Sequence, residues 1–179
     1  MRTLPDLLRP GLEVVFVGIN PGEASARAGH YYAHPGNAFW RELDASGLIE
    51  GGASTLTPRD DRTLISRGVG FTDVVKRVVT ASAQVTSAEL LAGVPAFRAR
   101  LAYASPRAVC FTSTRALQAV LPGARSAHSW GRQAGVVAGA VPWLMPSTSG
   151  RAAAYRGEVG RVLRELAAEL HRESSERAA

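Results

Sequence analysis

The sequence Glu13-Val14-Val15-Phe16-Val17-Gly18-Ile19, which leads into Asn20-Pro21-Gly22, decides the class of fold. A continuous apolar run of this length is typical of a strand that is buried on both faces, as the central strands of a parallel sheet are. The proline and the glycine that follow predict a sharp loop directly after the strand. Because helices must cover both faces of such a sheet, the run indicates an α/β protein.

Patterns on either side of this run predict the remaining strands and helices. Apolar runs indicate strands at residues 107–112 and 141–145, with a further strand or hairpin at 135–141. Helical patterns cover residues 37–47, 59–66, 86–103, 113–120 and 151–172. Thr72 or Asp73 can cap a short helix that ends at Val79. On the helix at 86–103, the predicted apolar face consists of Leu90, Leu91, Val94, Phe97 and Leu101.

The alternation of strands and helices predicts one domain over residues 1–172, followed by a frayed tail at 173–179. Its expected architecture is a three-layer α/β/α sandwich with a central, mainly parallel sheet. Ligands of such sheets bind at the carboxyl ends of the strands. The loops after residues 19 and 145 lie at that edge, so we expect them to carry the function.

Charge and composition limit the classes of partner. Lysine and arginine together number 21 against 15 acidic residues, which gives a net charge of +6, and Lys76 is the only lysine. Arginine forks suit phosphate groups, so the composition favours a nucleic acid partner. An arginine-rich composition with solvated side chains is the alternative, and charge alone does not separate the two.

The titratable residues predict no metal and no cofactor. The single cysteine, Cys110, lies in an apolar run and is expected to be a buried, inert thiol. The four histidines have no spacing that is typical of metal ligands. The sequence has neither a signal-peptide pattern nor an apolar run of membrane-spanning length. We therefore expect a cytoplasmic protein that acts as a monomer and has no membrane partner.

The loop at residues 18–22 carries the first candidate functional side chain. Asn20 ends a buried strand, so its amide is held rigidly at the edge of the sheet where ligands bind. An amide can orient a water molecule or bind a substrate without changing charge. The alternative is an ordinary Asn-Pro-Gly turn that binds nothing.

Two further loops favour binding of a base and of a phosphate. In the aromatic stretch at 30–40, Phe39 and Trp40 fit core packing, whereas Tyr32 precedes the predicted helix and can stack on a base. The stretch at 145–151 is rich in serine and precedes the last predicted helix, whose N-terminus would attract a DNA phosphate. A helix cap without a ligand is the alternative.

Four segments together resemble the mismatch-specific uracil-DNA glycosylase family, which is related to thymine-DNA glycosylase within the uracil-DNA glycosylase superfamily. They are Gly-Ile-Asn-Pro-Gly at 18–22, Ala-His-Pro-Gly-Asn-Ala-Phe-Trp at 33–40, Gly-Val-Gly-Phe-Thr-Asp at 68–73 and Met-Pro-Ser-Thr-Ser-Gly-Arg at 145–151. They occur in the family's order and spacing, and the resemblance covers roughly residues 4–170. It implies the uracil-DNA glycosylase fold and, as the partner, double-stranded DNA that contains uracil or a mismatched pyrimidine.

The resemblance also implies which residues bind the base. Asn20 would place the attacking water, and Ser25 would lie beside carbon 5 of the base, where it influences the tolerance of a methyl group. Tyr32 would stack on the base, while backbone groups around Ile19 and Tyr32 would read its edge. The base-binding residues that the resemblance implies are Ile19, Gly22, Ser25, Tyr32 and His34.

For the DNA backbone, the resemblance implies contacts from Ser147, Thr148, Ser149, Gly150 and Arg151. Ser147 would hold a phosphate near the flipped nucleotide, and residues 149–151 match the wedge that enters the duplex. Ser149 is small where bacterial mismatch-specific enzymes carry a bulky apolar residue. We therefore expect Arg151 to fill more of the vacated space, and a strong dependence on an opposing guanine is in doubt.

Asp73 is a second departure, because relatives carry a neutral or basic residue at this position. A carboxylate near the flipped base could accept a proton from water and stabilise the positive charge that develops on the sugar. We therefore hypothesise that Asn20 positions the water and Asp73 activates it. The alternative is that Asp73 only caps a helix.

The sequence thus predicts a monofunctional DNA repair glycosylase. It would flip uracil, and related pyrimidines such as thymine or ethenocytosine opposite guanine, out of DNA and hydrolyse the N-glycosidic bond to leave an abasic site. A non-catalytic module that recognises lesions or mismatches is the alternative, and it would need neither Asn20 nor Asp73. A nucleotide-binding or phosphate-transfer enzyme ranks last, because the sequence contains no G-x-x-x-x-G-K-[ST] loop and no G-x-G-x-x-G turn.

Overall fold

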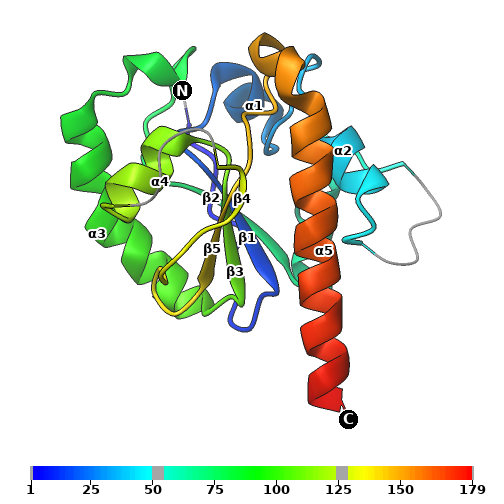
Figure 1. Ribbon diagram of the computed structural model, residues 1–179. Helices are drawn as coiled ribbons and strands as arrows, with labels where there is room; N and C mark the ends of the chain where they lie inside the picture. Colours follow the sequence, from blue (N-terminus) through cyan, green and yellow to red (C-terminus); the bar gives the residue numbers. More distant parts are fainter. Residues whose placement is uncertain (1, 50–54, 124–128, 179) are drawn as a thin grey trace.

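The computed structural model, which describes residues 2–49, 55–123 and 129–178, has a central sheet with helices on both faces (Figure 1). The five strands lie in the order β2-β1-β3-β5-β4. Their bounds are β1 Val14–Gly18, β2 Val69–Asp73, β3 Ala108–Phe111, β4 Gly131–Arg132 and β5 Val141–Leu144. Neighbouring strands are parallel except for β4 and β5, which are antiparallel. The predicted α/β/α sandwich with a mainly parallel sheet is confirmed.

Two hydrophobic clusters fill the space between the sheet and its helices. On one face, Val14 and Phe16 of β1 pack with α2 (Phe39–Ala45) and α5 (Arg156–Ala178). On the other face, Val15 and Val17 pack with α3 (Ser87–Ala104) and α4 (Thr114–Val120). All five residues of β1 are buried. Because each fully buried large apolar side chain contributes about 1.5–3 kcal/mol, the two clusters hold β1 rigidly in the middle of the molecule.

The strand β2 replaces the short helix that was predicted to begin at Thr72 or Asp73, so that prediction is wrong. Glycines at 68 and 70 hide the strand in the sequence, but a Cβ at Gly70 would lie 2.8 Å from the carbonyl oxygen of Leu7. Gly70 therefore allows the N-terminal segment to pass close to β2. Beyond Asp73 the chain follows the loop after β1, because the amides of Val74 and Val75 donate to the carbonyls of residues 18 and 19.

Other elements depart from the expected bounds. Residues 59–66 form two short 3-10 helices, η1 Pro58–Asp60 and η2 Thr63–Arg67, in place of one helix. Within the strand or hairpin that was expected at 135–141, the structure has a tight hairpin turn, closed by an antiparallel bridge between Val137 and Ala140. The helix α3 follows the helical pattern expected at 86–103, with Thr86 as its N-cap, but Leu91, expected on its apolar face, is 58% exposed. A short helix that was not predicted, α1 Glu23–Ala28, follows the first loop.

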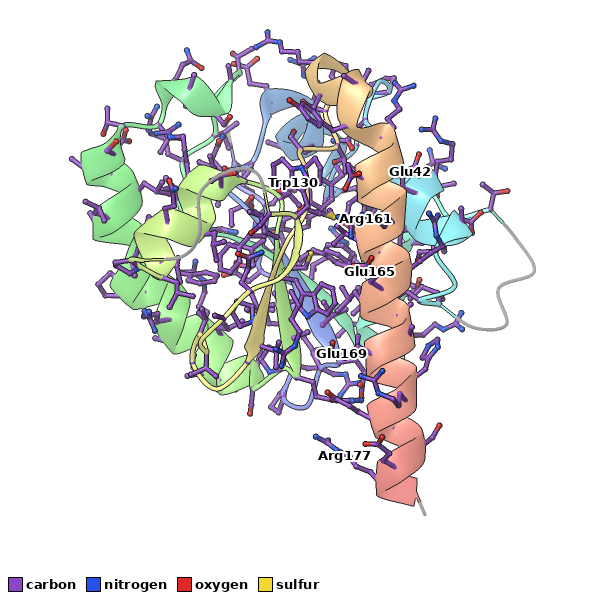
Figure 2. The ribbon with its side chains drawn as sticks, viewed as in Figure 1. Glu42, Trp130, Arg161, Glu165, Glu169 and Arg177 are labelled. Atoms are coloured by element: carbon purple, nitrogen blue, oxygen red, sulfur yellow. The ribbon has the colours of Figure 1, made fainter. Side chains whose placement is uncertain are left out.

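The terminal helix α5 continues to Ala178, through residues where a frayed tail was expected. Arg107, at the start of β3, explains this continuation: it bonds the side chains of Glu173 and Ser174 and the carbonyl of Leu170. Along the same helix, Arg161 pairs with Glu158 and Glu165, and Arg132 of β4 pairs with Glu169. Figure 2 labels Arg161, Glu165 and Glu169 on this helix. The helix is therefore fixed to the sheet by polar contacts as well as by its apolar face.

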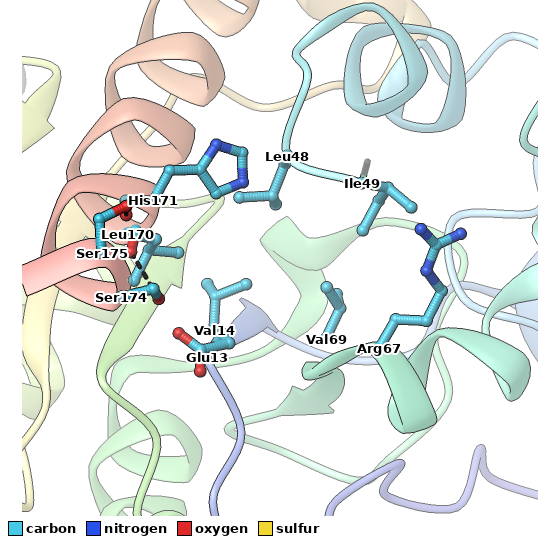
Figure 3. A pocket seen from close by; sticks show the side chains of 10 residues that line it. All are labelled: Glu13, Val14, Leu48, Ile49, Arg67, Val69, Leu170, His171, Ser174 and Ser175. Atoms are coloured by element: carbon cyan, nitrogen blue, oxygen red, sulfur yellow. Dashed lines mark hydrogen bonds between the residues drawn. The ribbon is translucent and has the colours of Figure 1, made fainter. Parts of the chain in front are cut away.

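The edge of the sheet where β1 and β2 begin has a cavity of about 570 Å³, between Val14, Val69 and the last turns of α5 (Figure 3). None of the functional residues predicted from the sequence lines it. Among the helices that the structure describes, no stretch has both the length and the apolar character that crossing a bilayer demands.

Candidate active site

A cavity of about 700 Å³ opens at the other edge of the sheet, where β1 and β2 end. It gathers side chains from the loop after β1, the aromatic stretch, the end of β2 and the loop before α5. The predicted residues that line it are Asn20, Gly22, Ser25, Tyr32, His34, Asp73, Ser149, Gly150 and Arg151. Ile19 and Ser147 line a neighbouring cavity of about 490 Å³ instead. Thr148 is buried and lines neither of these two cavities.

The register between β1 and β2 sets the position of the Asp73 carboxylate. Gly18 and Asp73 are the last residues of their strands and lie directly opposite each other. A Cβ on Gly18 would lie 2.4 Å from Asp73 Oδ1 and 4.0 Å from the backbone nitrogen of Asn20. No side chain larger than hydrogen fits there without displacing the carboxylate. Gly18 is therefore the residue that allows Asp73 and Asn20 to share one end of the sheet.

Asp73 is a buried acid with few partners. Its side chain is 5% exposed, and its Oδ2 lies 3.8 Å from Lys76 Nζ. Within the described ranges, this Oδ2 has no hydrogen-bond partner. Burial raises the pKa of Asp73 to about 7, although the nearby Lys76 acts in the opposite direction. A carboxyl group with a pKa near neutrality can accept a proton from water at physiological pH.

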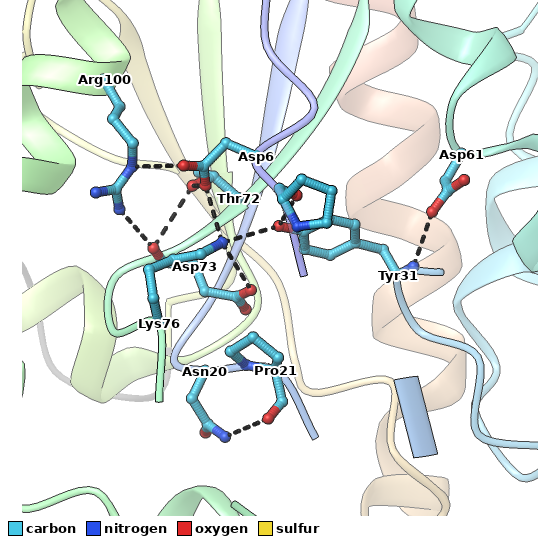
Figure 4. A network of polar contacts seen from close by, with 10 residues as sticks. Asp6, Asn20, Pro21, Tyr31, Asp61, Thr72, Asp73, Lys76 and Arg100 are labelled. Atoms are coloured by element: carbon cyan, nitrogen blue, oxygen red, sulfur yellow. Dashed lines mark hydrogen bonds and ion pairs between the residues drawn. The ribbon is translucent and has the colours of Figure 1, made fainter. Parts of the chain in front are cut away.

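Asn20 follows the buried strand and has a fixed amide. Its Nδ2 donates to the carbonyl oxygen of Pro21 at 2.9 Å, and Figure 4 shows this pair beside Asp73 and Lys76. Because the nitrogen is used in this way, Oδ1 is the atom of the amide that is available to accept a hydrogen bond from a water molecule.

Tyr32 lines the cavity with a ring that is already packed on one side. Its backbone has a left-handed φ of 53°. Phe39 stacks on one face, with ring centroids 4.1 Å apart. Stacking on a base would therefore use the opposite face. The hydroxyl is buried and lacks a partner among the described residues.

Ser25 and His34 stabilise the loops around the cavity. Ser25 Oγ accepts a hydrogen bond from the Ala33 amide at 3.1 Å, which joins α1 to the aromatic stretch. His34 Nδ1 accepts from the Gly36 amide at 3.0 Å, and the residue is exposed at the rim. Both contacts lie within the chain, and they hold the wall of the cavity in place.

The loop at 145–151 packs against the aromatic stretch across the mouth of the cavity. The carbonyl of Thr148 accepts from the Ala38 amide at 2.8 Å, and Ser147 Oγ bonds Ser149 Oγ at 3.1 Å. The residues that follow form a 3-10 helix, Gly150–Tyr155, and α5 begins only at Arg156. The expectation that this loop meets the N-terminus of the long helix is therefore wrong. Arg151 is exposed at the rim instead.

Sequence reasoning missed a set of polar residues behind Asp73 (Figure 4). Asp6 accepts hydrogen bonds from Thr72 Oγ1 at 2.6 Å and from Lys76 Nζ at 2.9 Å. Arg100 of α3 donates to the backbone carbonyl of Asp73 at 2.8 Å and lies 3.2 Å from Asp6. The one available signal was that the chain's only lysine stands three residues after Asp73.

The fold and the cavity define a class: an α/β protein that binds its ligand where the parallel strands end, with a fixed amide and a buried acid in one pocket. Residues 5–171 match the uracil DNA glycosylase superfamily, and the chain belongs to it. Membership supports the activity of a DNA glycosylase, a hydrolase that acts on DNA. The superfamily that the four sequence segments implied is therefore confirmed.

A solved structure with a similar fold is the solution NMR structure of a protein from Methanosarcina acetivorans that is named as a candidate uracil DNA glycosylase. The two chains are 24% identical, with a TM-score of 0.59. The similarity covers 92% of this chain and 97% of the other. It confirms the architecture over nearly the whole length of both proteins.

The close approach at Gly18 gives a first prediction. Gly18→Ala places a Cβ 2.4 Å from Asp73 Oδ1, so the carboxylate must move. We expect the free energy of unfolding, measured with urea, to fall by about 1–3 kcal/mol. Gly22→Ala is the matched control, because a Cβ there meets nothing within 4 Å. Equal losses in the two variants would contradict the close approach.

The buried acid gives a second prediction. A pKa that rises from 3.8 to about 7 on folding means that the folded chain favours protonated Asp73. Its contribution to stability is therefore most favourable below pH 3.8 and is lost as the pH rises to about 7. Asp73→Asn mimics the protonated form, so at pH 8 it should unfold at a higher temperature than the parent chain. The gain should shrink steadily toward pH 4, and a gain that does not depend on pH would contradict the raised pKa.

Proposed function

We propose that this protein removes uracil from double-stranded DNA by flipping the nucleotide and hydrolysing its N-glycosidic bond. Related pyrimidines opposite guanine, such as thymine and ethenocytosine, are the further proposed substrates. The observation that supports this most directly is the meeting of Asn20 and Asp73 in one cavity at the end of the parallel strands. The membership of the superfamily and the four sequence segments at 18–22, 33–40, 68–73 and 145–151 point to the same substrate class.

In this proposal the cavity of about 700 Å³ receives the extruded base. Flipping costs a few kcal/mol, and it costs least at a mispair, which gives part of the selectivity. The base would stack on the face of Tyr32 opposite Phe39, with Ser25 at the wall beside it. Stacking on an aromatic ring contributes roughly 1–3 kcal/mol, which offsets much of the cost of flipping. Arg151, which is exposed at the rim, would enter the space that the nucleotide leaves.

The proposed chemistry uses one water molecule and two side chains. Cleavage of the bond between the base nitrogen and the sugar carbon passes through a state with positive charge on the sugar. Asn20 holds the water through its amide oxygen, and Asp73 accepts a proton from it. The base leaves first, as an anion with the electron pair of the broken bond, and the water oxygen then bonds the positive sugar carbon as its proton passes to Asp73. The ionised Asp73 also stabilises the positive sugar before water attacks.

The test of this proposal is the release of uracil under single-turnover conditions. Duplexes that hold one U:G or U:A pair, and the corresponding single strand, are incubated with excess protein and treated with alkali, which cleaves at abasic sites. We expect cleavage with the parent chain, fastest at U:G. Asn20→Ala and Asp73→Asn should each lower the rate by about 10²–10⁴-fold, the range of a positioned acid or base.

Asp44→Asn is the matched control, because it removes one carboxylate from an exposed position on α2. Its rate should equal that of the parent chain. If Asp73→Asn also keeps the parent rate, Asp73 has no part in the chemistry. If the parent chain binds the duplexes but releases no base, the protein is a binding module and not a glycosylase.

A further inference from the structure

Two carboxylates compete for one ammonium group behind the cavity. Lys76 Nζ lies 2.9 Å from Asp6 Oδ1 and 3.8 Å from Asp73 Oδ2. The shorter contact is a charged hydrogen bond, whereas the longer one is not a hydrogen bond. Lys76 therefore makes its closest contact with Asp6, and Oδ2 of Asp73 has no hydrogen-bond partner among the described residues.

Asp6 is held firmly enough to determine which carboxylate Lys76 binds more closely. The N-terminal segment is fixed to β2 by two backbone hydrogen bonds between Leu7 and Phe71, of 2.9 and 3.0 Å. Leu4 and Leu7, on either side of Asp6, are buried in the hydrophobic cluster. The carboxylate of Asp6 also accepts from Thr72 Oγ1 at 2.6 Å. The position of Asp6 thus follows from backbone pairing and burial, and not from the lysine.

Among the groups around Asp73, Lys76 is the cation that can move between the carboxylates of Asp6 and Asp73. Arg100 donates a hydrogen bond to the backbone carbonyl of Asp73 and forms an ion pair with Asp6, so these two contacts fix its guanidinium group. The Tyr31 hydroxyl donates to the carbonyl of Pro5 at 3.1 Å and lies 3.3 Å from Lys76 Nζ. The Tyr32 ring lies on the side of the cavity and is neutral. Of these groups, Lys76 touches both carboxylates with one flexible side chain.

We propose that Asp6 is a positioning residue for Asp73: by binding Lys76, it holds the ammonium beyond hydrogen-bond distance of Asp73 Oδ2 and leaves that oxygen free to take a proton from water. This inference rests on the proposed function, in which Asp73 activates the water. Asp6 touches neither the base nor the sugar; it acts through Lys76. In line with this arrangement, Asp6 raises and Lys76 lowers the pKa of Asp73.

The inference predicts opposite effects for the two partners. In Asp6→Asn the ammonium is released toward Asp73, and one neighbouring negative charge is lost, so the pKa of Asp73 should fall. An opposite charge in contact lowers the pKa of a carboxyl group, so we expect a decrease of about one pH unit or more. In Lys76→Gln the cation is removed, and the pKa should rise. The double variant should lie between the two, and Asp6→Glu should restore the parent value in part.

The direct readout is the carboxyl ¹³C resonance of Asp73, followed by NMR from pH 4 to pH 9 in each variant. Its assignment comes from the loss of the signal in Asp73→Asn. The second readout is the acid limb of the single-turnover rate of uracil release, which should move in the same direction as the NMR midpoint. Asp44→Asn, which removes an equal charge from an exposed site, should leave both midpoints where the parent chain has them. Thermal unfolding of each variant shows that it is folded.

The two readouts separate the failure of this inference from the failure of the proposed function. If Asp6→Asn leaves the NMR midpoint unchanged, or if both single variants move it in the same direction, the role of Asp6 is overturned. If the midpoints move in opposite directions but neither the parent chain nor any variant releases base, the role of Asp6 in holding Lys76 stands and the proposed function fails. If Asp73→Asn loses the acid limb while Asp6→Asn keeps it at the parent pH, only the inference on Asp6 fails.

Discussion

The site depends on one steric constraint, the close approach of the Asp73 carboxylate to Gly18 where β1 and β2 end in register. Two neighbouring strands of a parallel sheet bring their carboxyl ends to the same edge, but a side chain at position 18 would occupy the space that the Asp73 carboxylate takes. The missing side chain of Gly18 removes this barrier. The carboxylate then lies beside the loop that carries Asn20, and one pocket receives both an acid and an amide.

This constraint has an energetic consequence. Ionised Asp73 is almost fully buried and is only partly compensated by Lys76, so the site costs stability at neutral pH. The cost is offset by the two hydrophobic clusters, which bury every residue of β1 and fix the strand from both faces. A group that is unfavourable for folding and has a pKa close to neutrality is typical of a functional site. The stability of the core is thus what allows a reactive carboxyl group at the edge.

The features that the sequence could predict are those with a local pattern. The apolar run at 13–19 indicated the central strand, and the turn residues after it marked the loop of Asn20. The strand β2 was missed because Gly68 and Gly70 interrupt its pattern, and these glycines reflect packing against the N-terminal segment, which no local rule reveals. Because no strand was predicted there, Asp73 was expected to cap a helix, whereas it ends β2.

Long-range contacts account for the rest of what was missed. Asp6 and Lys76 are 70 residues apart in the chain. Arg100, which also contacts Asp6, comes from α3, a helix that follows β2 in the sequence. The extension of α5 to Ala178 depends on Arg107, which likewise comes from a distant strand. The resemblance to a family could identify individual site residues. The network of Asp6, Lys76 and Arg100 that shifts the pKa of Asp73 exists only in the folded chain. The roles of Asn20, Tyr32 and Ser147 in binding and catalysis stay predictions.

The most direct test of the site is a crystal structure of the protein on a duplex that holds 2′-fluoro-deoxyuridine opposite guanine. The fluorine disfavours positive charge on the sugar, so the base stays attached and the complex can be observed before cleavage. The expected result is a flipped uracil against Tyr32, with a water molecule between Asn20, Asp73 and the sugar carbon. A base that remains stacked in the duplex, or one that binds outside this cavity, would contradict the site.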